Sequence, residues 1–147
     1  MLEELKRPKI GIGVMIKNKN NEVLLGLRQG SHGEGEWSYP GGHLDFGETM
    51  EETVRREVKE EVGLKVGKVE LISVADEMRY IKSDGKHYVN IGFSAEYLGG
   101  EPELMEPEKC KEWRWFSLDN LPENLFEGTE LNIKNYRAGK IYQPAIK

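Results

Sequence analysis

Residues 42–64 read GHLDFGETMEETVRREVKEEVGL, and the spacing of charged residues and glycines in this stretch suggests both a fold and a reaction. The fixed positions of the pattern are Gly42, Glu48, Arg56, Glu57, Glu60, Glu61 and Gly63, together with the apolar Val58 and Leu64. In a chain of average composition, so many residue types would rarely stand at fixed spacings by chance. A metal-dependent phosphate site could use this combination.

The middle of the stretch predicts a helix from about Thr49 to Val62. Thr49-Met50-Glu51-Glu52 has the capping-box pattern, and Gly63 is placed to take the left-handed conformation after the last turn. Apolar residues recur every four positions and predict a buried stripe, made by Met50, Val54, Val58 and Val62.

Three glutamates, Glu57, Glu60 and Glu61, are predicted to fall on one side of this helix, beside the buried stripe. Such residues are usually a solvated face, and Arg56 could simply pair with Glu52 or Glu60. The turn Tyr39-Pro40-Gly41-Gly42 favours a metal site instead, because its glycines expose backbone oxygens close to the carboxylates. Mg²⁺ prefers oxygen ligands and commonly bridges carboxylates and substrate phosphates.

Composition limits the alternatives. The 147-residue chain is 37% hydrophobic, which fits one globular domain, residues 1–147, with no membrane-spanning segment. A single cysteine, Cys110, and no apparent signal peptide lead us to expect a cytoplasmic protein with an ordinary thiol. The formal net charge of −5 and the absence of long basic runs argue against a nucleic acid polymer as partner.

The pattern of apolar runs predicts a mixed sheet in an α/β domain. A hairpin is expected at 10–16 and 22–27, a second strand pair at 69–81 and 86–98 around Ser83-Asp84-Gly85, a short strand at 112–116, and a helix around 130–138. In residues 88–97 apolar and other residues alternate, which predicts a strand with one apolar face.

The residue 42–64 pattern matches every fixed position of the Nudix hydrolase signature, so the chain resembles this family. The resemblance implies a mixed sheet sandwiched between helices, with a loop-helix-loop that binds Mg²⁺ or Mn²⁺, and hydrolysis of diphosphates linked to another group. It implies that Gly42, Glu57, Glu60 and Glu61 hold the metal and that Arg56 orients Glu57. Glu48 would lie in the supporting shell.

Residues 23–129 further resemble the MutT-homologue-2 type of nucleoside triphosphate diphosphatases, which are homodimers that release monophosphate and pyrophosphate. The resemblance implies that Arg28 and His43 lie near the phosphates, and that the base pocket is bordered by Tyr39, Asn90, Leu125, Phe126 and Gly128. Tyr39, Asn90, Glu127 and Thr129 depart from those relatives, which leaves the preferred base open.

Simpler roles stay open for several of these residues. Arg28 could be a surface arginine, Tyr39 and Phe126 could be packing residues, and His43 could be a structural hydrogen-bonding group. Trp113, Trp115 and Phe116 are expected in the core or at a dimer interface.

The expected chemistry is attack of a metal-activated water on phosphorus. Glu57 is the first candidate for the base, Glu60 remains possible, and Glu106 or Glu108 could supply a further ligand or base. Three rivals remain: hydrolysis of ADP-ribose, a nucleotide sugar or a dinucleotide; a sensor that binds nucleotide without turnover; and RNA decapping, which is disfavoured because the sequence shows no basic groove.

Overall fold

The computed structural model describes residues 6–30 and 32–146; the predicted domain, residues 1–147, extends beyond these. The strands are β1 (Lys9–Lys17), β2 (Glu22–Arg28), β3 (Trp37–Ser38), β4 (Gly41–His43), β5 (Val66–Glu77), β6 (Tyr88–Tyr97) and β7 (Cys110–Ser117). The helices are α1 (Met50–Val62), α2 (Ile81–Asp84) and α3 (Glu127–Ala138).

The strands form one mixed sheet. Its main order is β3-β2-β1-β6-β5, with β7 paired to β2 and β4 paired to β1. The central pair, β1 and β6, is parallel from Lys9↔Tyr88 to Lys17↔Glu96, whereas the other pairs are antiparallel. The predicted mixed sheet is confirmed.

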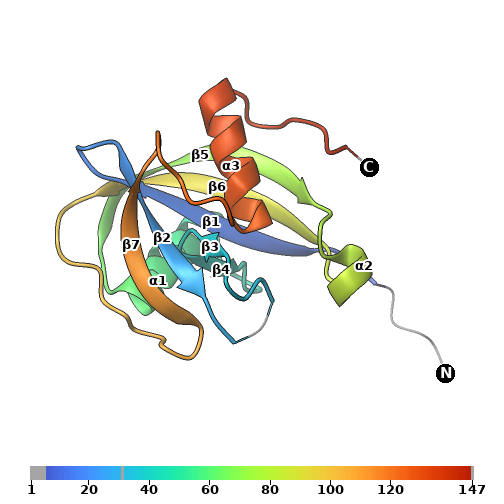
Figure 1. Cartoon of the computed structure of the whole chain (residues 1–147), viewed down its shortest axis with the longest axis horizontal. Helices are drawn as coiled ribbons and strands as arrows, with labels where there is room; N and C mark the ends of the chain where they lie inside the picture. Colours follow the sequence, from blue (N-terminus) through green and yellow to red (C-terminus); the bar gives the residue numbers. More distant parts are fainter. Residues whose placement is uncertain (1–5, 31, 147) are drawn as a thin grey trace.

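Helices cover both faces of the sheet: α3 crosses in front of the strands in Figure 1, and α1 lies behind them. The α1 side has a core built around Val54, Val58 and Val62. The α3 side has a second core in which Ile133 packs with Met15, Val23 and other sheet residues. The expected α/β sandwich is therefore confirmed.

Two local predictions need correction. The expected turn at Ser83-Asp84-Gly85 is the end of a short helix, α2, so β5 ends at Glu77 and β6 begins at Tyr88. Gly85 closes α2 with φ 63°, and this turn signal belongs to a helix end. In β6, Asn90 and Gly92 are buried, because both faces of this central strand are covered.

The strand β1 changes partners along its length. Near Lys17 it pairs with Val23 of β2, but Gly11–Gly13 pair with Gly41–His43 of β4. The strands β1 and β2 therefore diverge, and β4 pairs with β1 in the part where they separate. This divergence places residues of β1, β2, β4 and α1 around one cavity.

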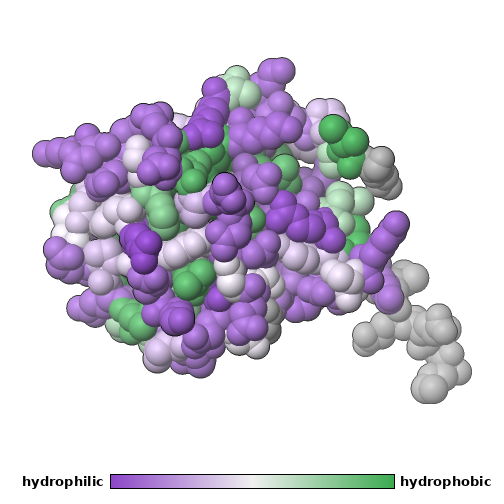
Figure 2. Space-filling view, in the orientation of Figure 1, coloured by the Kyte–Doolittle hydropathy of each residue, from purple (hydrophilic) through white to green (hydrophobic). Residues whose placement is uncertain are grey.

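Hydrophilic residues cover most of the face shown in Figure 2, with small hydrophobic patches between them. Within residues 6–30 and 32–146, no helix is long and apolar enough to cross a membrane.

Candidate functional site

The helix α1 is fixed at both ends as the sequence predicts. The Thr49 hydroxyl accepts from Glu52 N–H at 3.1 Å, and the Glu52 carboxylate accepts from Thr49 N–H at 3.0 Å, completing the capping box. Gly63 takes the left-handed conformation, with φ 73°. Of the predicted apolar stripe, Met50 is the exception: it is 40% exposed, while Thr53 takes the buried position in the first turn.

In the C-terminal half of this helix, Glu57 and Glu61 form a buried pair of carboxyl groups. The Glu57 side chain is only 13% exposed. The Glu57 and Glu61 carboxyl groups lie within hydrogen-bonding reach of each other, and Gly41 N–H donates to Glu61. Burial raises the pKa of both groups, and the charge of Glu57 raises that of Glu61 further.

Gly42 lies directly over this pair. A Cβ at residue 42 would overlap the Glu57 carboxylate, so the glycine keeps the backbone of β4 against the two acids. Within the described residues, no three His, Cys, Asp or Glu side chains converge closely enough to hold a metal ion. The donors that do converge are two carboxyl groups and a glycine turn. This oxygen donor set suits Mg²⁺, with water and substrate oxygens completing the coordination.

Arg56 ties the carboxylates of the loop and helix together. Its guanidinium donates to Glu48 at 2.7 Å and 2.9 Å and to Glu57 at 2.8 Å, and lies 3.2 Å from Asp45. The hydrogen bonds from Arg56 lower the pKa of Glu48 to about 2. Glu48 is thereby held ionised in a supporting position, and Glu57 has a charged donor on one side.

Glu60 lies apart from the other two glutamates. Its side chain is 51% exposed, accepts from Arg56 at 3.2 Å, and is not among the residues lining the cavity. Its predicted part in metal binding or as base therefore stays a prediction that would require the side chain to turn inward.

A cavity of about 450 Å³ opens beside the glutamate pair. Ligand pockets in proteins commonly have volumes of roughly 300–1,000 Å³. Its lining includes the glutamate pair and the glycine turn, which are Glu57, Glu61, Gly41 and Gly42. It also includes Arg28, His32, Glu77, Tyr88, Asn90 and Phe126.

Five of the residues assigned to substrate by resemblance line this cavity: Arg28, Tyr39, His43, Asn90 and Phe126. Leu125 and Gly128 do not. Leu125 packs in the core on the α3 side, and Gly128 lies so close to Asn90 that a Cβ there would come within 2.7 Å of its Nδ2. Gly128 shapes the cavity by letting α3 approach Asn90.

Arg28 and aromatic rings form one wall. The Arg28 guanidinium lies 4.1 Å from the centre of the Phe126 ring, and its Nε donates to the His32 carbonyl at 2.9 Å. The Phe126 and Tyr80 rings stack at 5.7 Å. Burial lowers the pKa of Arg28, and Glu61 opposes that shift. Arg28 is thus a cavity residue held between acidic groups.

Tyr39 and His43 combine packing with cavity lining. Tyr39 is 5% exposed, and its hydroxyl donates to Asn132 at 3.1 Å in the core on the α3 side. His43 Nε2 lies 3.0 Å from the Tyr88 hydroxyl, and burial lowers the pKa of this histidine. The neutral imidazole of His43 is therefore favoured.

The residues of the lining that the sequence analysis did not assign to the site include His32, Glu77 and Tyr88. Glu77 had a weak signal, because Ser73, Ala75 and Glu77 alternate along β5 and all three are buried. His32 lies in a turn-rich segment with no periodicity and gave no signal.

The loop before β7 contributes one of its two glutamate candidates. Glu106 lines the cavity and raises the pKa of Glu61 by its charge, whereas Glu108 is not part of the lining. Cys110 is buried, and burial raises the pKa of its thiol to about 11, which makes it a poor nucleophile.

Residues 7–137 match the family model of the NUDIX domain. The chain is 34% identical over 133 residues to the ADP-ribose pyrophosphatase of Methanocaldococcus jannaschii, covering 90% of this chain and 75% of that protein. It is 34% identical over 118 residues to the NAD-capped RNA hydrolase NudC of Stutzerimonas stutzeri, covering 78% of this chain and 39% of that protein.

The chain therefore spans less than half the length of the NudC relatives that it matches. Among solved structures, the MutT NUDIX hydrolase from Burkholderia pseudomallei superposes with a TM-score of 0.82 and 32% identity, covering 88% of this chain and 98% of the other. The signature in α1, the family match across most of the sequence and this structural likeness together show that the chain belongs to the Nudix hydrolase family.

Proposed function

We propose that this chain hydrolyses a nucleoside triphosphate to a monophosphate and pyrophosphate, with Mg²⁺ as cofactor and Mn²⁺ as a possible substitute. The observation that carries the proposal is the buried Glu57–Glu61 pair beneath the Gly41–Gly42 turn. Two adjacent buried acids present oxygens that a divalent cation would bind, and the cation would favour their ionised forms.

Bound Mg²⁺ would neutralise phosphate oxygens and lower the pKa of an attacking water. Glu57 is the proposed base or base-orienting residue, since Arg56 holds its carboxylate from the outer side at 2.8 Å. Glu61 holds the metal from the inner side, and Glu106 is the candidate additional acid from the loop. Arg28, on the cavity wall, would bind the phosphates.

A nucleoside triphosphate is favoured over larger substrates by the resemblance to the MutT-homologue-2 type and by one cavity that contains both acids and aromatic rings. The relatives' names point to other diphosphates, ADP-ribose and NAD-capped RNA. We also propose that the protein is a cytoplasmic homodimer, as the enzymes of the MutT-homologue-2 type are. Analytical ultracentrifugation would measure the number of subunits.

The test is pyrophosphate or phosphate-ester release with Mg²⁺ from a panel of nucleoside triphosphates, ADP-ribose, NAD and NAD-capped RNA. Glu57→Gln and Glu61→Gln should each lower kcat by at least about 100-fold while the protein stays folded, because each removes a metal oxygen charge. Glu51→Gln is the matched control: Glu51 lies on the same helix, its side chain is 60% exposed, and it pairs with the neighbouring Arg55.

Full activity in either cavity variant would overturn the assignment of the glutamates. Turnover of ADP-ribose or NAD with none of the triphosphates would replace the proposed substrate. Tight nucleotide binding without turnover of any diphosphate would favour the sensor.

A further inference from the structure

Part of the cavity is lined by buried polar atoms that have no protein partner. Within residues 6–30 and 32–146, the buried side-chain atoms without a hydrogen bond are His32 Nε2, Glu77 Oε1, Asn90 Oδ1 and Asn132 Nδ2. The first three belong to residues that line the cavity. Burying a polar atom without a partner is unfavourable, so such a cluster at a cavity points to a ligand that supplies the missing bonds.

Glu77 and Asn90 form a pair within this cluster. Glu77 lies at the end of β5 and Asn90 near the start of β6, and these two strands pair with each other. Glu77 pairs with Tyr88, and Ala75 pairs with Asn90. The Asn90 side chain hydrogen-bonds to Glu77. Both residues are over nine-tenths buried, with exposures of 4% for Glu77 and 7% for Asn90.

This internal hydrogen bond fixes the orientation of the amide. When Glu77 is ionised its carboxylate only accepts, so Asn90 then presents its NH₂ group to Glu77 and leaves its oxygen unused. The pair therefore offers two acceptors, Glu77 Oε1 and Asn90 Oδ1, and needs a ligand with two donors.

The surroundings suit a flat ring. Tyr88 and Phe126 line the same cavity, and Gly11 lies under the pair, with Asn90 and Glu77 atoms 3.8 Å and 4.0 Å from the position of a Cβ. The charges of Arg28 and Arg79 favour the ionised form of Glu77, and the charge of Glu61 acts on Arg28 as well. The charge of Arg28 thus interacts both with the Glu77–Asn90 pair and with the proposed metal site. The sugar and phosphates of a nucleotide would lie between these two places.

We propose that Glu77 and Asn90 select a nucleotide whose base presents two adjacent N–H donors, as the N1–H and 2-amino group of guanine do and as adenine does not. This inference rests on the proposed function for the direction of the phosphates. It assigns Glu77 a contact with the base and makes it a specificity-determining residue.

The experiment compares GTP, ITP and ATP, because ITP keeps N1–H but lacks the 2-amino group, and adenine N1 is an acceptor. The wild-type kcat/KM should fall in the order GTP, ITP, ATP. Glu77→Gln keeps the size of the side chain but replaces an acceptor by a donor, so it should lower kcat/KM for GTP by about 10- to 100-fold and change that for ATP by less than about threefold.

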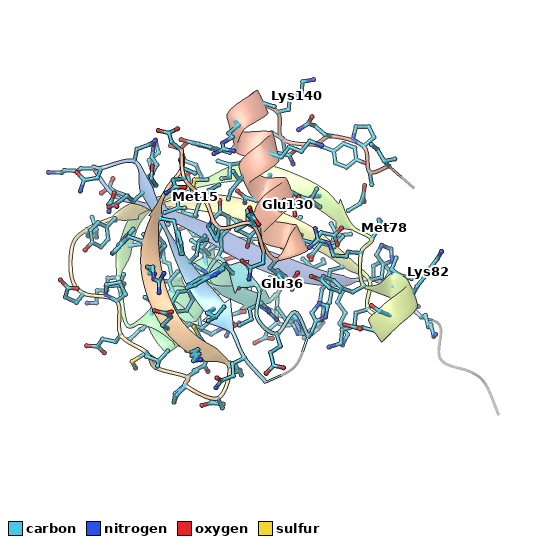
Figure 3. All side chains as sticks on the ribbon, in the orientation of Figure 1. Met15, Glu36, Met78, Lys82, Glu130 and Lys140 are labelled. Atoms are coloured by element: carbon cyan, nitrogen blue, oxygen red, sulfur yellow. The ribbon has the colours of Figure 1, made fainter. Side chains whose placement is uncertain are left out.

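Glu130→Gln is the matched control for loss of a nearby negative charge. Glu130 lies on α3 (Figure 3), binds Arg79 at 2.8 Å and does not line the cavity, so the GTP-to-ATP ratio should not change. Thermal melting of both variants verifies that they fold, and Asn90→Ala is a second variant that should weaken the same preference by a similar factor.

Calorimetric binding of GMP, IMP and AMP to the same proteins separates this inference from the proposed function, because it needs no turnover. A GMP preference lost in Glu77→Gln supports the base assignment even if no triphosphate is hydrolysed. Hydrolysis of all three triphosphates at equal efficiency, or an equal loss for all three in Glu77→Gln, overturns the base assignment and leaves the proposed hydrolysis standing.

Discussion

At the scale of single residues, the ionisation of Glu77 links the stability of the fold to the cavity. Burial raises the pKa of Glu77 to about 7, with Glu127 on α3 adding to the shift. Asn90 on β6, Arg28 on β2 and Arg79 after β5 oppose it. The side chain thus changes charge close to neutral pH, in contact with a buried amide.

This shift has a defined sign. An ordinary glutamate loses its proton near pH 4.5, whereas Glu77 keeps its proton until about pH 7. Between these values the folded chain binds more protons than the unfolded chain, so stability falls as the pH rises through this window. Glu77→Gln should therefore raise the free energy of unfolding by about 1–3 kcal/mol at pH 8 and change it little at pH 4.

Urea unfolding of both proteins at the two pH values measures this difference. The Glu130→Gln protein provides the reference for a lost surface charge. An equal difference between wild type and Glu77→Gln at pH 4 and pH 8 would contradict the assigned ionisation.

At the scale of elements, the contact between β4 and α1 decides whether the glutamate pair can form. Gly42 of β4 lies over Glu57 of α1, and the added Cβ of an alanine would meet only the end of a flexible side chain. Gly42→Ala should therefore displace the Glu57 carboxylate without breaking the fold. We expect a loss of about 10-fold or more in kcat/KM, with a small change in Tm, because a displaced ligand misplaces the reacting groups.

Steady-state kinetics and thermal melting measure the two effects. Gly13→Ala is the control, since a Cβ at this position of β1 makes only ordinary contacts, with Tyr39 at 3.6 Å as the nearest. Unchanged activity in Gly42→Ala would show that the close approach of β4 to Glu57 has no part in the reaction.

The same elements show what the sequence could predict. The α1 helix was predictable to within one residue, because Thr49, Glu52 and Gly63 are local signals that act through the backbone. The end of β5 was not, because residues 78–87 include a short helix whose closing glycine also fits a hairpin turn.

The site residues likewise divide into those that a local sequence pattern predicts and those that it does not. Gly42, Glu57 and Glu61 belong to one contiguous pattern, and the structure brings them together. Glu77 and His32 reach the cavity through strand pairing and a turn whose geometry depends on distant segments, so a local pattern marks Glu77 only weakly and His32 not at all. The half-exposed position of Glu60 likewise depends on its hydrogen bond to Arg56, which competes with an inward orientation.

At the scale of the whole molecule, the net charge of −5 adds to the local repulsion around Glu57 and Glu61. A divalent cation bound there would stabilise the folded chain relative to the unfolded chain. Mg²⁺ at millimolar concentration should raise the Tm by about 2–5 °C.

Differential scanning fluorimetry with increasing MgCl₂, at constant ionic strength, measures the shift. The shift should disappear in the Glu57→Gln/Glu61→Gln protein and persist in Glu51→Gln. A Tm that is indifferent to Mg²⁺ in the wild type would count against a metal at this pair.

The parallel pairing of β1 with β6 also governs when the cavity can form. This pairing joins Lys9–Lys17 to residues 88–96, so a long segment must be ordered before the centre of the sheet closes. Contacts between such distant segments slow folding, because the loop between them must lose its conformational freedom first. During synthesis, the early hairpin of β1 and β2 can form without β6. Asn90 reaches the cavity only after β6 is in place, so the ability to bind a base is expected to arise in one of the last steps of folding.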